Sequence, residues 1–61
     1  MLDKYVIEQL GAGFVVIDAS GERGKFGEAY AGSDKTWRDQ LVGVPLFETQ
    51  SAAEQWADSL S

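Results

Sequence analysis

The chain has 61 residues, of which ten are acidic and five are basic, so its formal net charge is −5 at pH 7. This length suits one domain, 1–61, near the lower limit for folding without a disulfide or a structural metal. Cysteine and histidine are both absent, which excludes disulfides, thiolate metal sites and histidine-based catalysis. We therefore expect no metal, no cofactor and no enzymatic turnover.

The acidic residues are distributed unevenly along the chain. Up to Arg38 there are six acids and five bases, whereas the residues after it include no base and four acids, Asp39, Glu48, Glu54 and Asp58. Direct binding to nucleic acid needs clustered lysine and arginine, so this half of the chain disfavours it. The same charge is compatible with docking on a basic protein. The alternative is that the acids only keep a small domain in solution.

Two further absences bear on where the protein acts. No apolar stretch approaches the roughly twenty residues of a membrane span, and no signal peptide is visible. The lack of cysteine also fits a reducing compartment. We expect a cytoplasmic protein.

The first third of the chain predicts an antiparallel β-hairpin between about Tyr5 and Asp18. The segment 4–10 is rich in β-branched and aromatic residues, 11–13 (Gly-Ala-Gly) forms a short connection, and 14–18 indicates a second strand. Because Phe14 to Ile17 is apolar throughout, this strand should be central. Asp18 and Gly21 occupy the first and fourth positions of a predicted type I turn.

The middle of the chain gives weaker signals. Residues 22–31 fit either a short third strand or a loop that brings Phe26 and Tyr30 into the core. Residues 34–41 favour a short helix, with Ser33 as N-cap and Trp37 and Leu41 as an i,i+4 pair; a strand through 36–42 is the alternative. The segment 44–48 indicates an extended stretch, because Pro45 suits a sheet edge.

The C-terminal residues, from about Ser51 to Leu60, predict an amphipathic helix. Its apolar stripe consists of Ala52, Ala53, Trp56, Ala57 and Leu60. Ser51 and Glu54 could form a capping box, and Thr49 is a rival N-cap. We expect Trp56 to be buried against one face of the second strand, either Val15 and Ile17 or Phe14 and Val16. The predicted fold is α+β: an antiparallel sheet of two to three strands packed by this helix, with a second helix at about 34–41 as a further option.

The sequence motifs that could bind ligands fail in context. The glycines at 11 and 13 lack the following helix of a dinucleotide fingerprint, and Gly24-Lys25 lacks the rest of a phosphate loop. The alternating polar residues Asp18, Ser20 and Glu22 match a turn better than a calcium loop. The one basic and aromatic cluster, 35–38, is expected to be a solvated helix face.

Residues 47–49 (Phe-Glu-Thr), followed by a helix that carries Ala53 and Ala57, resemble the end of AP2-type and integrase-arm DNA-binding domains. In those families a Phe-x-Thr segment precedes an alanine-rich helix that packs on a three-stranded sheet. The resemblance covers about fifteen residues and implies the sheet-plus-helix arrangement. It does not imply DNA binding, because those sheets read DNA with the Arg and Lys residues that this chain lacks.

In size, acidity and lack of cysteine the chain is also similar to the small inhibitors that phages make against host defence, such as anti-CRISPR and anti-restriction proteins. This resemblance implies a non-enzymatic protein, monomeric or homodimeric, that acts in the host cytoplasm. It would occupy the cationic nucleic-acid site of a larger complex, with Asp39, Glu48, Glu54 and Asp58 as partner-binding residues. The alternatives are a structural or oligomerising module and, third, a small carboxylate-based hydrolase.

Overall fold

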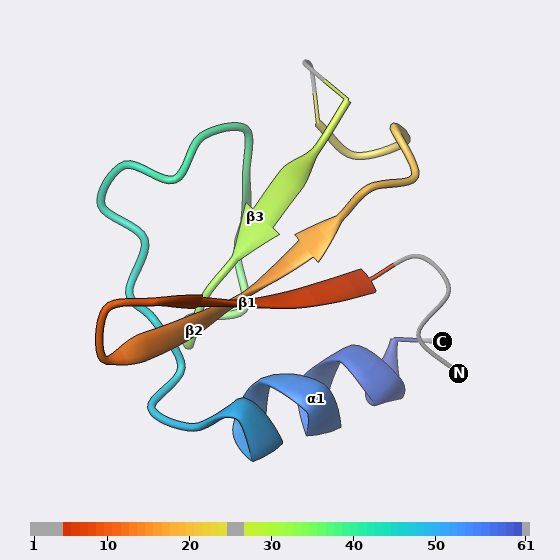
Figure 1. The fold of residues 1–61 in the computed structure, drawn as a ribbon. Coiled ribbons are helices and arrows are strands. Elements are labelled where there is room, and N and C mark those ends of the chain that lie inside the picture. Colours follow the sequence, from red (N-terminus) through yellow and green to blue (C-terminus); the bar gives the residue numbers. More distant parts are fainter. Residues whose placement is uncertain (1–4, 25–26, 61) are drawn as a thin grey trace.

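The computed structural model describes residues 5–24 and 27–60, which form one antiparallel sheet covered on one face by a helix (Figure 1). The strands are β1 (Tyr5–Leu10), β2 (Gly13–Asp18), β3 (Ala29–Ala31) and β4 (Trp37–Arg38), arranged in the order β1-β2-β3-β4. The helix α1 (Gln50–Ser59) packs against β1 and β2. The α+β prediction is confirmed, although the sheet has four strands instead of two or three.

The predicted hairpin is confirmed, with a tighter loop than expected. Leu10 pairs with Gly13, so only Gly11 and Ala12 lie between the strands. Gly11 has φ 62°, and a glycine with positive φ at the first loop position fits a type II′ hairpin turn. A Cβ on Gly13 would lie 2.4 Å from Cβ of Leu46, so a side chain cannot be accommodated there without displacing the later loop.

The reversal after β2 is longer than the predicted type I turn. Oδ1 of Asp18 accepts a hydrogen bond from the Ser20 amide at 2.9 Å, an Asx turn that starts the reversal. The chain returns to the sheet only at Ala29, where β3 pairs with β2. A third strand was one of the two predicted options, and Tyr30 within it is half-buried. The expected burial of Phe26 falls outside the described residues.

The helix predicted at 34–41 is wrong. Asp34 accepts a hydrogen bond from the Thr36 amide, Lys35 has φ 59°, and the chain then enters β4. The i,i+4 spacing of Asp34 and Arg38, which looks helical in the sequence, is instead an ion pair formed across this turn. Pairing with β3 places Trp37 beside Ala31 on the face toward α1, and this burial outweighs a weak local helix preference.

The segment before α1, for which the sequence predicted an extended stretch, forms one isolated bridge to β2 at Phe47. Phe47 donates a backbone hydrogen bond to Phe14 at 2.8 Å and accepts one from it at 2.9 Å. The amide of Ser33 donates to the carbonyl oxygen of Pro45 at 2.7 Å. These bonds hold 45–47 against β2 beyond the end of β3.

The N-cap of α1 is Thr49, the second of the two predicted caps. Oγ1 of Thr49 accepts a hydrogen bond from the Ala52 amide at 3.1 Å, so the Ser51–Glu54 capping box is wrong. Glu54 instead accepts from the side chain of Gln50. The buried face of α1 is centred on Ala53 and Ala57, and Ala52, which we expected in the apolar stripe, is exposed.

The core lies between α1 and one face of the sheet. It contains Tyr5, Val16, Phe47, Ala53 and Ala57, with Phe14 and Trp56 packed against it. The helix therefore covers the Phe14 and Val16 face of β2, and Val15 and Ile17 point to the other face. Trp56 is half-buried, not buried as expected, and lies 5.3 Å from Trp37 and 5.9 Å from Phe47 between ring centroids. Within the described residues, no helix is long and apolar enough to cross a membrane.

The position of Trp56 generates a stability prediction. Trp56→Ala should lower the free energy of unfolding by about 3 kcal/mol, because it removes the ring that bridges the helix to Trp37 and Phe47. Urea denaturation followed by circular dichroism would measure this loss. The matched control is Gln55→Ala, at an exposed neighbour on the same helix, which should change stability by less than about 0.5 kcal/mol. Equal stability of the two variants would show that α1 docks through its alanines alone.

Candidate interaction surfaces

A buried carboxylate organises the end of the sheet that holds the 19–28 connection. Asp18 is 2% exposed, and its Oδ2 lies 2.7 Å from Nε of Arg23. Burial alone raises the pKa of this carboxyl, but hydrogen bonds from Ser20 and Arg23 outweigh it and leave the pKa below its usual value. The carboxylate is therefore ionised and fully engaged by its own chain.

The partner of Asp18 also joins an aromatic row. The guanidinium of Arg23 lies over the Trp37 ring, 4.9 Å from its centroid, a cation–π geometry. Trp37 stacks on Tyr5 with 6.1 Å between ring centroids and also contacts Trp56 at 5.3 Å. The Tyr5 phenol, together with Asp18, raises the pKa of Arg23 despite its partial burial. This network fixes Arg23 to the sheet, and no sequence spacing indicated it.

The basic and aromatic cluster at 35–38 does not form one surface. Trp37 faces the helix, whereas Arg38 pairs with Tyr30 on the opposite face of the sheet. The two terminal nitrogens of the Arg38 guanidinium, Nη1 and Nη2, donate hydrogen bonds to Oδ1 and Oδ2 of Asp34 at 3.1 and 2.6 Å. Hydrogen bonding from Arg38 is the main reason that the pKa of Asp34 is lowered. We expected these residues on the solvated face of a helix. They lie instead on and before strand β4, and Trp37 and Arg38 point to opposite faces of the sheet.

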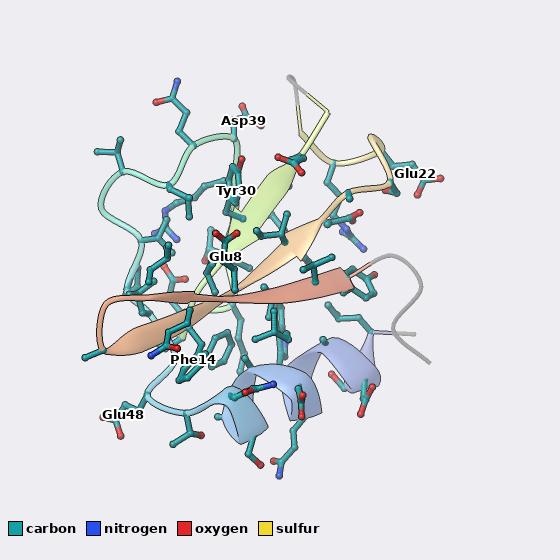
Figure 2. The ribbon with its side chains drawn as sticks, in the orientation of Figure 1. Glu8, Phe14, Glu22, Tyr30, Asp39 and Glu48 are labelled. Atoms are coloured by element: carbon teal, nitrogen blue, oxygen red, sulfur yellow. The ribbon has the colours of Figure 1, made fainter. Side chains whose placement is uncertain are left out.

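The four predicted partner-binding acids divide into two places. Glu54 and Asp58 lie four residues apart on α1, and the exposed Glu48 immediately precedes its N-cap. Asp39 follows β4, and Figure 2 shows it at the opposite end of the molecule from Glu48. The structure thus associates three of these acids with the helix and leaves Asp39 apart from them. Their role in binding stays a prediction.

A second acidic group, which the sequence analysis did not single out, lies on the sheet face away from α1. The hydroxyl of Tyr30 donates to the carboxylate of Glu28 at 3.2 Å, and Glu8 of β1 lies nearby (Figure 2). Hydrogen bonding to Glu28, with the charge of Glu8, raises the pKa of Tyr30. Strand alternation is the sequence signal for this group, but it needs the strand register. With the register known, residues 8 and 30 fall on the same face of the sheet.

Exposed apolar side chains occur beside this face and in the loop that precedes 45–47. Val6 on β1 is 53% exposed, and Val42 in the loop is 82% exposed. Leu41 next to it is also exposed. Among the described residues, no group of three acids is arranged to hold a metal ion.

The Asp18 ion pair generates a pH-dependent prediction. Asp18→Asn should lower the free energy of unfolding by about 2 kcal/mol at pH 7, because a buried charge-assisted hydrogen bond is lost. A carboxyl whose pKa is depressed by folding stabilises the protein above its unfolded value, 3.8, and loses this effect as the pH falls through the folded pKa. The difference between wild type and variant should therefore shrink from pH 7 to pH 2.

Urea denaturation at several pH values would measure this difference. The matched control is Asp34→Asn, in an ion pair whose members are each about one third exposed, and it should cost clearly less stability at pH 7 than Asp18→Asn, because solvent screens the pair. An Asp18→Asn penalty that stays constant with pH would show that the side chain acts by shape and not by charge.

With this geometry established, the chain was compared with known proteins. Neither protein-family models, nor curated proteins, nor solved structures gave a match.

Proposed function

We propose that this protein is a small non-enzymatic binding domain that docks through its acidic surface on a basic, nucleic-acid-binding protein. Its carboxylates would occupy the positions that phosphates normally take, so that it inhibits the partner, as anti-CRISPR and anti-restriction proteins do. This proposal continues the expectation from charge and size. The structure supports it through the way in which it uses the few bases available.

The supporting observation is that both arginines form ion pairs with carboxylates of their own chain. Arg23 is bound to Asp18 and lies on Trp37, and Arg38 is bound by both oxygens of Asp34. The described residues include two other kinds of charged side chain: one further base, Lys35, and seven further acids, Glu8, Glu22, Glu28, Asp39, Glu48, Glu54 and Asp58. Because acids outnumber bases among the described residues, the net field of this part of the chain is negative, which steers a basic partner toward the domain.

The helix offers the most regular display of these charges. Glu54 and Asp58 are one turn apart, about 6 Å along the helix axis, so that one cationic patch of a partner would reach both carboxylates. The helix is held by its buried alanine face and capped by Thr49, so its acids are presented with little loss of entropy on binding.

A structural or oligomerising module is the second candidate function. The exposed Leu41 and Val42 in the 39–46 loop favour it, because such side chains gain by being covered. Catalysis has less support: the one buried carboxylate of the described chain, Asp18, is engaged by Ser20 and Arg23.

The proposal predicts that charge reversal on the helix abolishes binding. Affinity capture with the tagged chain at low salt would recover the partner, which is then purified and tested with labelled duplex DNA and RNA. The wild-type domain should displace the nucleic acid, and its affinity should fall as salt rises, since the Debye length shortens to about 8 Å at physiological ionic strength. The double variant Glu54→Lys, Asp58→Lys should fail to displace it.

The matched control is Glu8→Lys with Glu28→Lys, which makes the same change in net charge on the opposite face of the sheet. It should still compete for the partner, with circular dichroism confirming that both variants are folded. Equal binding by both double variants would mean that the helix acids are not the interface. A partner that retains its nucleic acid while the domain is bound would refute inhibition by occupation of the site.

A further inference from the structure

Strand β1 forms one edge of the sheet and has no neighbour on its outer side among the described residues. The strand order places it first, and it is six residues long, whereas β4 at the other edge has two. It contains no proline and no lysine, which are the residues that commonly protect such edges. An edge strand of this length, with Glu8 as its one charged side chain, can accept another strand.

The hydrogen bonds around Phe14 show which residues of β1 point their backbone groups outward. Phe14 exchanges both of its hydrogen bonds with Phe47, on the side away from β1. Its partner across the hairpin, Gln9, is therefore in a non-hydrogen-bonded pair, and this pattern alternates along the strand. By that alternation Tyr5, Ile7 and Gln9 direct their N–H and C=O groups to the free edge.

We propose that β1 pairs antiparallel with β1 of a second copy of this chain about a two-fold axis at Ile7. In this register Ile7 lies opposite Ile7 of the second copy, and Tyr5 lies opposite Gln9. All three outward-pointing residues then form hydrogen-bonded pairs, each of which exchanges two backbone bonds. The two sheets become one continuous sheet with both helices on the same face, because the axis is perpendicular to the sheet.

The side chains of β1 select this register over its neighbours. On the face away from α1, the exposed Val6 of one copy lies opposite Glu8 of the other, and it covers the aliphatic part of that side chain. A shift that centres the axis on Glu8 would place two carboxylates directly opposite each other, which is destabilising. A shift that centres it on Val6 leaves Gln9 without a hydrogen-bonded partner strand. On the helix side, the half-buried Ile7 gains its own counterpart as a neighbour.

The charge of the domain sets the sign of the salt effect. Each copy carries −5, so two copies repel each other and added salt strengthens their association by screening. Docking on a basic partner has the opposite dependence. The opposite salt dependences therefore allow self-association and docking on a basic partner to be tested separately.

A single-cysteine scan tests the register, because the chain has no cysteine of its own. Opposed residues in a hydrogen-bonded pair have Cα atoms about 5.5 Å apart, within the range of about 4.4–6.8 Å for a disulfide. The Ile7→Cys variant should cross-link to itself in a glutathione redox buffer. The matched control is Gln9→Cys, whose two copies would lie about 13 Å apart along the strands and should stay uncrosslinked. The variants Val6→Cys and Glu8→Cys complete the test. Val6→Cys would cross-link most strongly only if the axis were at Val6, and Glu8→Cys only if it were at Glu8.

Sedimentation equilibrium of the wild-type chain measures the association itself. We expect a dimer with a Kd of about 1 mM or tighter, which strengthens between low and high salt. Val6→Glu, which sets two like charges opposite each other, should weaken the dimer about tenfold, and adding Glu8→Lys to it should restore the association. A monomer throughout this range, or strongest cross-linking at a position other than 7, would overturn the proposal.

Discussion

The structure depends on the close approach of α1 to the sheet, which Ala53 and Ala57 allow because they have no side chain beyond Cβ. This approach buries Val16 completely and brings Trp56 level with the sheet edge. Trp56 then joins Tyr5, Trp37 and Phe47 in the aromatic row that closes the side of the core. In a domain of this size, whose chain has no cysteine to form a disulfide, this apolar contact is the main source of stability.

The polar groups are arranged around that row. Arg23 lies over the ring of Trp37 and is itself held by the buried Asp18, so the ion pair ties the segment that follows β2 to the core. The same arrangement explains the character of the surface. Both arginines are engaged in ion pairs within the fold. The charge that remains on the surface for a partner comes mainly from carboxylates.

The two proposed contacts use different parts of the molecule. The helix acids lie on the layer below the sheet, and the free edge of β1 lies at its border (Figure 1). A two-fold pairing at β1 would place two copies of the helix on one side of the continuous sheet. Two acidic helices held in this way could engage a partner together, and avidity would then compensate for modest affinity at each.

The sequence by itself determined the hairpin, the extended stretch at 44–48 and the terminal helix, because these elements rest on local patterns. The runs of β-branched residues, the glycine-containing loop and the helical spacing of Ala53, Trp56 and Ala57 all act over a few neighbouring positions. The same patterns could not distinguish the two faces of β2, since Phe14 to Ile17 are all apolar. They also left the choice of Thr49 over Ser51 as N-cap open.

Only the tertiary structure decided the middle of the chain and the grouping of its charges. Residues 34–41 carry weak preferences for both helix and strand, and the choice was made by pairing with β3 and by packing of the half-buried Trp37 against Trp56. The placement of Arg23 over Trp37, the approach of Glu8 to Tyr30 and the separation of Asp39 from the acids of α1 all depend on how the strands pair. Register brings distant residues together through long-range contacts, and no spacing along the sequence encodes it.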